Sequence, residues 1–130
     1  VLLNLAVNAC DAMQGIDGER TLIVRTGVTP GSGIEVAVID NGPGIPEDEI
    51  PVVLQSFGRG SHAIKTAEQG SGLGLPIVKG LVDLHEGGFD LKSRPRDGTV
   101  VTITFPPTRV MDTLPAVQPE SLPKKRPYAA

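Results

Sequence analysis

Two pairs of strand-like segments, each pair joined by a short turn, constrain the fold of this chain most strongly. The first pair covers 21–26 and 34–39 and is joined by a proline- and glycine-containing turn at 30–33. The second pair covers 89–93 and 99–105. The first pair is rich in β-branched residues, which favour strands, and in the second pair Val101, Ile103 and Phe105 alternate onto one face. Because a turn reverses the chain within each pair, each pair is predicted to form an antiparallel hairpin.

Segments with helical periodicity surround the hairpins. They cover 2–13, a short stretch at 46–54 that begins with proline and acidic residues, and 73–85. The order is then helix, two strands, short helix, loop, helix, two strands. This order predicts an α+β fold, a two-layer α/β sandwich whose mixed, largely antiparallel sheet carries helices on one face.

The composition excludes several classes of protein. The 130 residues suit one domain, 39% are hydrophobic, and no apolar run approaches the roughly 20 residues that span a bilayer. The net charge of −3 argues against nucleic-acid binding. A single cysteine, Cys10, cannot form an internal disulfide, so we expect a cytoplasmic location. Because no apolar run is long enough to span a bilayer, we also expect no membrane contact by this domain itself.

The two ends of the chain carry different signals. Helical periodicity is already present at Val1, without a preceding cap, so we expect an N-terminal truncation of a domain covering 1–110. Half of the twelve prolines lie between Pro106 and Pro127. Because proline at this density blocks helices and central strands, 111–130 is predicted to be a disordered tail.

Two asparagines, Asn4 and Asn8, are four residues apart and share one face of the first helix, which Asp11 continues. An asparagine carbonyl oxygen is a hard neutral ligand that can join a magnesium shell completed by water and phosphate. The alternative is a pair of hydrogen-bonded core amides.

Asp40 ends a β-run and is followed by Gly42 and Gly44. A carboxylate in this setting can reach a ligand without obstruction and accept a hydrogen bond from an exocyclic amine. The alternative is a tight turn, since Asn-Gly and Pro-Gly are common turn dipeptides.

A glycine triplet spaced G-x-G-x-G at 70–74 precedes the last helix. Such glycines let backbone N–H groups approach phosphate at a helix N-terminus, although a flexible linker is the alternative. The spacing is neither the dinucleotide fingerprint nor a Walker loop. Before it, Phe57 and Arg59 open a long loop in which Arg59, His62 or Lys65 could touch phosphate.

These motifs occur in a fixed order that resembles the ATP-binding catalytic domain of bacterial sensor histidine kinases. That domain belongs to the superfamily of gyrase, the ninety-kilodalton heat-shock chaperone and the mismatch-repair ATPases, which share a Bergerat-type ATP-binding fold. Residues 1–13 resemble the asparagine box, 40–44 the first glycine box, 56–60 the phenylalanine box and 70–74 the second glycine box. Asp97-Gly98-Thr99 is similar to the closing Gly-Thr element.

The resemblance implies ATP and Mg²⁺ as cofactors, with Asn8 as the metal ligand, Asp40 accepting from the adenine amine, and catalytic roles for Asn4 and Arg59 near the phosphates. Many kinases of this family have lysine at the position of Asp11. The nucleotide-binding residues implied are Asn8, Asp11, Asp40, Gly42, Gly44, Phe57, Lys65, Gly70, Ser71, Gly72, Leu73, Gly74 and Thr99.

The residue one helical turn before Asn8 distinguishes relatives that hydrolyse ATP from those that transfer its phosphate. Relatives that hydrolyse ATP have glutamate there, whereas this chain has Asn4, whose amide cannot act as a general base. The resemblance therefore implies transfer of the γ-phosphate to a histidine in a separate helical dimerisation domain, with a response regulator downstream. The alternative is a degenerate, nucleotide-gated interaction module without phosphotransfer activity.

Overall fold

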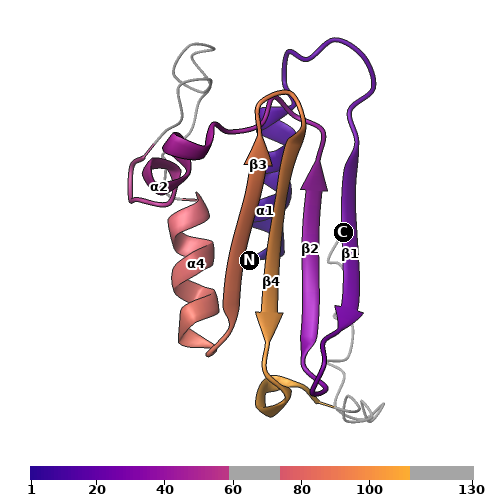
Figure 1. Ribbon diagram of the computed structural model, residues 1–130, viewed down its shortest axis with the longest axis vertical. Helices are drawn as coiled ribbons and strands as arrows, with labels where there is room; N and C mark the ends of the chain where they lie inside the picture. Colours follow the sequence, from indigo (N-terminus) through magenta and orange to yellow (C-terminus); the bar gives the residue numbers. More distant parts are fainter. Residues whose placement is uncertain (59–73, 112–130) are drawn as a thin grey trace, which may run out of the picture.

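The computed structural model describes residues 1–58 and 74–111, which form a four-stranded antiparallel sheet with helices on one face. The strand order across the sheet is β1-β2-β4-β3, so the second strands of the two hairpins lie side by side in the centre (Figure 1). The strands are β1 (Leu22–Val28), β2 (Ile34–Asp40), β3 (Gly88–Arg94) and β4 (Gly98–Phe105).

The helical layer consists mainly of α1 (Leu2–Ala12) and α4 (Gly74–Leu84), which contact each other and pack on β2 and β3 respectively. Figure 1 shows α1 behind the sheet and α4 beside β3, both running roughly along the strands. The predicted α+β two-layer sandwich is therefore confirmed. None of the described helices is both long and apolar enough to cross a membrane.

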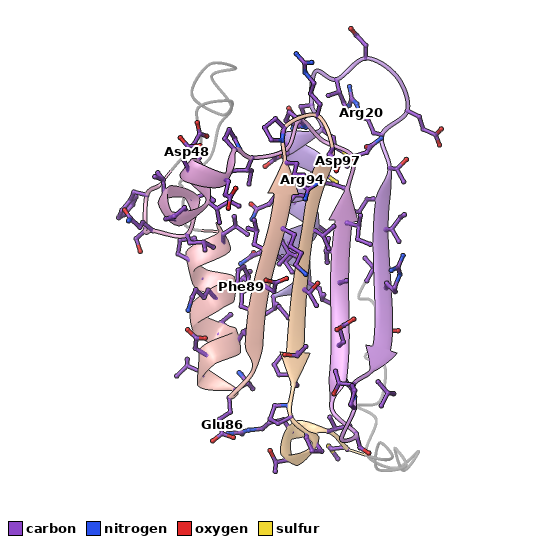
Figure 2. The ribbon with its side chains drawn as sticks, viewed as in Figure 1. Arg20, Asp48, Glu86, Phe89, Arg94 and Asp97 are labelled. Atoms are coloured by element: carbon purple, nitrogen blue, oxygen red, sulfur yellow. The ribbon has the colours of Figure 1, made fainter. Side chains whose placement is uncertain are left out.

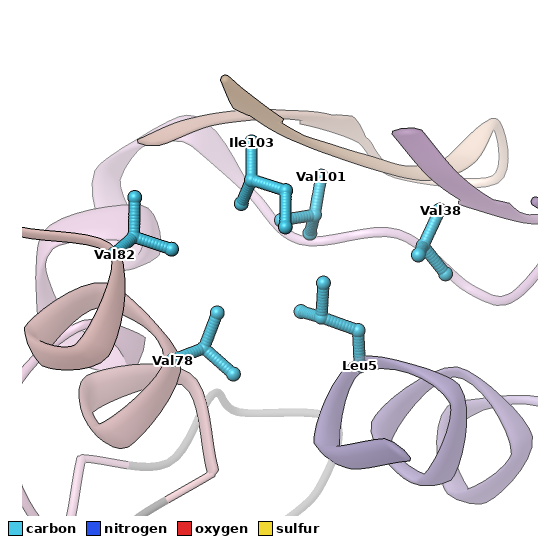
Figure 3. Packing of buried hydrophobic residues seen from close by; sticks show 6 residues of the cluster. All are labelled: Leu5, Val38, Val78, Val82, Val101 and Ile103. Carbon is cyan, nitrogen blue, oxygen red and sulfur yellow. The ribbon is translucent and has the colours of Figure 1, made fainter. Parts of the chain in front are cut away.

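The core lies between the helices and the two central strands. Helical spacing places Leu5, Val78 and Val82 on the sheet-facing sides of α1 and α4, and strand alternation places the other members on one face of the sheet. Each of the six is at most 6% exposed. Figure 3 shows their side chains in the space between the helices and the sheet. The core residues are Leu5, Val38, Val78, Val82, Val101 and Ile103.

Both predicted hairpins are confirmed, and each strand is slightly longer than the segment predicted for it. In the second hairpin Pro95 is followed by Arg96 at φ 67°, and Asp97 N–H bonds the Arg94 carbonyl at 3.0 Å. This is the arrangement of a type II turn. Across the sheet, Asp40 pairs with Thr99, which pairs with Ser93, so three polar residues form one row at this end.

The short helix predicted over 46–54 is divided in two. A 3₁₀-helix, η1 (Glu47–Glu49), precedes a single α-helical turn, α2 (Ile50–Val53). Pro51 explains the division, because it has no N–H with which to continue a helical ladder from η1. A second 3₁₀ turn, η2 (Pro107–Arg109), follows β4. The predicted loop and tail lie outside the described residues, apart from their first positions.

Candidate functional site

Asp40 is the last residue of β2 and is only 9% exposed. Its Oδ1 accepts a hydrogen bond from the backbone N–H of Gly42 at 2.8 Å, and the backbone N–H of Thr99 is a further donor. Burial raises the pKa of the carboxyl above its ordinary value of 3.8, although the two backbone hydrogen bonds act in the opposite direction. The structure thus holds a buried acceptor in a fixed orientation at the end of the sheet.

The loop after Asp40 lies between α1 and the β3–β4 turn. A Cβ at Gly42 would be 2.8 Å from Asp40 Oδ1 and 3.6 Å from Ala12 Cβ. Gly44 has φ +72°, and a Cβ there would overlap the Arg94 carbonyl oxygen. The Pro43 carbonyl accepts the Arg96 N–H at 2.7 Å. Neighbouring atoms therefore leave no room for a side chain at Gly42 or Gly44, and the positive φ of Gly44 also favours glycine.

Asn41 has the structural role expected of a turn residue. Its side-chain carbonyl accepts the Thr21 N–H and its amide donates to the Glu19 carbonyl, each at 2.8 Å. These bonds tie the end of β2 to the connection between α1 and β1. Figure 2 shows Arg20 of this connection at the same end of the molecule as Arg94 and Asp97.

A hydroxyl network holds the other side of the loop. Ser93 Oγ accepts the Ile45 N–H at 2.8 Å, bonds the Gly98 carbonyl at 2.8 Å and lies 2.9 Å from Thr99 Oγ1. Sequence reasoning named Thr99 but missed Ser93. A signal was present, since Phe89, Leu91 and Ser93 alternate along one strand and the serine replaces an apolar residue.

Asn8, on α1, lies next to the start of α4. A Cβ at Gly74 would lie 2.8 Å from Asn8 Oδ1 and 2.9 Å from Nδ2. Asn4, Asn8 and Asp11 are all half-buried, and Asp11 accepts a hydrogen bond from Gln14 at 3.1 Å. Asn8 lies one helical turn, about 6 Å along the axis, before Ala12, and Ala12 is the α1 residue that Gly42 approaches.

The possible metal ligands near Asn8 suit magnesium better than a metal ion that is held entirely by protein side chains. The described residues contain no group of three or more His, Cys, Asp or Glu side chains that could hold an ion. Mg²⁺ usually keeps several waters and takes few protein ligands together with phosphate oxygens. A single asparagine carbonyl, half-buried on α1 beside the start of α4, fits that requirement.

Phe57 and Gly58 end the first described part of the chain. Phe57 is 73% exposed with φ 65°, and a Cβ at Gly58 would overlap the Val52 carbonyl oxygen. The remaining predicted site residues lie outside the described residues. They are Arg59, Lys65, Gly70, Ser71, Gly72 and Leu73.

The fold defines the class of protein, since its antiparallel sheet with helices on one face matches the ATPase domains of histidine kinases. The mycobacterial sensor histidine kinase MprB has a TM-score of 0.66 and 30% identity, covering 81% of this chain and 66% of that one. Full-length ShkA, in complex with AMPPNP, has the same fold with a TM-score of 0.67 at 24% identity, covering 81% and 20%.

Sequence comparison gives the family. Residues 1–109 match the family described as histidine kinase-, DNA gyrase B- and HSP90-like ATPase, and the chain belongs to that family. The sensor-type histidine kinase PrrB of Mycobacterium tuberculosis is 38% identical over 104 residues, covering 80% of this chain and 23% of PrrB. The cell-division control histidine kinase PdhS of Brucella ovis is 34% identical over 120 residues, covering 85% and 11%. The chain therefore spans less than a quarter of these relatives.

Proposed function

We propose that this chain is the ATP-binding, phosphoryl-donating domain of a two-component sensor histidine kinase. In this proposal it transfers the ATP γ-phosphate to a histidine of a separate helical dimerisation domain, and a response regulator receives the phosphoryl group next. The domain works in the cytoplasm. The observation that carries the proposal is the buried Asp40 carboxylate, which the backbone N–H groups of Gly42 and Thr99 hold at one end of the sheet.

Asp40 is suited to recognise adenine. An ionised carboxylate is an acceptor only, and the adenine amine is a donor. The N–H groups of Gly42 and Thr99 hold the carboxylate in place before ligand arrives, which reduces the entropy lost on binding. Burial strengthens a hydrogen bond made at this position.

Asn8 is suited to hold the metal of a nucleotide triphosphate. Bound Mg²⁺ would neutralise negative charge on the phosphates as the γ-phosphoryl group departs. Asn8 contributes one neutral oxygen from α1, and the glycine at the start of α4 leaves room for it. The other glycines of 70–74 would supply backbone N–H donors to phosphate. Arg59 would stabilise charge at the terminal phosphate.

The residue at position 4 favours transfer over hydrolysis. Asn4 is half-buried on the same side of α1 as Asn8, one turn earlier, and its amide has no basic site near neutral pH. Water in the site therefore lacks a general base at this position. A histidine imidazole needs no such group, because its neutral form already carries a nucleophilic nitrogen.

The direct test is phosphotransfer from γ-labelled ATP to a supplied helical domain that carries an exposed histidine. The chain should label that domain in a magnesium-dependent manner, and replacement of the acceptor histidine should abolish labelling. Arg59→Ala should slow transfer by about 10³-fold, as loss of an arginine finger does. ATP binding without any labelling would instead favour the degenerate, nucleotide-gated module.

A further inference from the structure

Ser93 Oγ makes three polar contacts at the end of the sheet, and together they determine where its hydrogen lies. The Ile45 N–H donates to Oγ at 2.8 Å, the Gly98 carbonyl is 2.8 Å away, and Thr99 Oγ1 is 2.9 Å away. A carbonyl oxygen can only accept, so the single Ser93 hydroxyl hydrogen bonds Gly98. Any other placement leaves two oxygen lone pairs facing each other at 2.8 Å.

The direction of the remaining contact follows. Because the Ser93 hydrogen is committed to Gly98, the contact between the two hydroxyls is a hydrogen bond only if Thr99 is the donor. The Thr99 hydroxyl hydrogen therefore points toward Ser93. What Thr99 Oγ1 offers to any other group is its lone pairs, so it is an acceptor toward a ligand.

Thr99 is also the direct neighbour of Asp40. The register pairs Ser93 with Thr99 and Thr99 with Asp40, so the three side chains lie in a row on the same face of the sheet. The backbone N–H of Thr99 bonds the Asp40 carboxylate. Two acceptors, a carboxylate and an oriented hydroxyl, consequently lie side by side at this end of the sheet.

We propose that Ser93 is a positioning residue that sets purine specificity by holding the Thr99 hydroxyl as an acceptor beside Asp40. The inference rests on the proposed function and names a further determinant of the same site. Adenine has an amine at its six-position, which can donate to the two acceptors. Guanine has a carbonyl there, whose lone pairs would face the lone pairs of Asp40 and Thr99 without a hydrogen between them. Without Ser93, the Thr99 hydroxyl is free to rotate and donate to that carbonyl.

The test compares ATP and GTP affinities by calorimetry for the full chain and its Ser93→Ala variant. The ratio of ATP affinity to GTP affinity should fall by about tenfold in Ser93→Ala, mainly because GTP binds more tightly. The variant relieves an unfavourable contact between two acceptors, the Thr99 hydroxyl and the guanine carbonyl, and such a contact weakens binding by about tenfold. Ser93→Thr keeps the hydroxyl and should restore the ratio. Thr102→Val, which removes a hydroxyl from the opposite face of β4, is the matched control.

A double-variant series separates positioning from mere stability. In a Thr99→Val background there is no hydroxyl to orient, so adding Ser93→Ala should leave the ratio unchanged. If Ser93→Ala does not fold, Ser93→Cys keeps the side-chain size and is measured instead. An unchanged ratio in the single variant overturns this inference alone. Failure of the unaltered chain to bind ATP overturns the proposed function and this inference with it.

Discussion

The side-chain amide of Asn8 on α1 lies directly against Gly74, the first residue of α4. A Cβ at position 74 would be 2.8 Å from Asn8 Oδ1, closer than real Cβ contacts. The absence of a side chain at the start of one helix thus leaves room for an amide on the other. This contact joins two motifs that are 66 positions apart in the sequence (74 − 8).

Gly74→Ala should displace the Asn8 amide and weaken magnesium-dependent ATP binding by about tenfold or more. The measurement is calorimetric titration with ATP, with and without magnesium. Gly80→Ala is the matched control in the same helix, because a Cβ there meets nothing within 4 Å. It should leave binding unchanged and raise the free energy of unfolding by about 0.5–1 kcal/mol. Equal affinities in the two variants would contradict the role given to Gly74.

Gly44→Ala should destabilise the fold through the β3–β4 turn. Gly44 combines φ +72° with close approach to the Arg94 carbonyl oxygen, so alanine is both strained and obstructed. We expect a loss of about 1–3 kcal/mol or more in urea-induced unfolding. Gly27→Ala, in the exposed edge strand β1 with open space around it, should change stability much less. A loss as large for Gly27→Ala would show that the turn contact is not the cause.

Asp40 should make the stability of the unliganded chain depend on pH with a definite sign. Its native pKa is raised above 3.8, so between the unfolded and native pKa values the native state holds more protons than the unfolded state. The contribution of Asp40 to the free energy of unfolding therefore falls as pH rises through that window. Asp40→Asn cannot ionise and should lack this decline.

The measurement is urea unfolding of both chains from about pH 4 to pH 7. The stability of the unaltered chain relative to Asp40→Asn should decrease as pH rises. Adenosine, which carries no phosphate, should bind the unaltered chain more weakly as pH falls through the native pKa, since the protonated carboxyl is a poorer acceptor. A relative stability that increases with pH would mean that hydrogen bonding outweighs burial at Asp40.

The sequence predicted the local elements well because each depends on near neighbours. Helical spacing predicted α1 and α4. β-Branched runs predicted the first hairpin, and alternation in 99–105 with the turn before it predicted the second. Strand order across the sheet could not be predicted, since it depends on how β2 and β4 meet through long-range packing. The interruption at Pro51 was readable in principle, because proline removes a helical donor.

The candidate site was predictable where a motif has a chemical reason. Asp40 and Asn8 were named because a strand-end carboxylate and a helical amide suit nucleotide chemistry. Their roles stay predictions, and the structure adds why their neighbours are glycines. Ser93 was missed because its significance lies in contacts with Ile45 and Thr99, which are distant or across a turn in sequence.

The most direct test of the account is calorimetric titration of the chain with ATP in magnesium, beside Asp40→Ala and Asn8→Ala. The titrations are repeated with GTP and without magnesium. We expect the unaltered chain to bind ATP more tightly than GTP, Asp40→Ala to lose this preference, and Asn8→Ala to lose the gain in ATP affinity from magnesium. Asp90→Ala, an exposed carboxylate on β3, should behave as the unaltered chain. Binding with no preference for adenine, unaffected by Asp40→Ala, would contradict it.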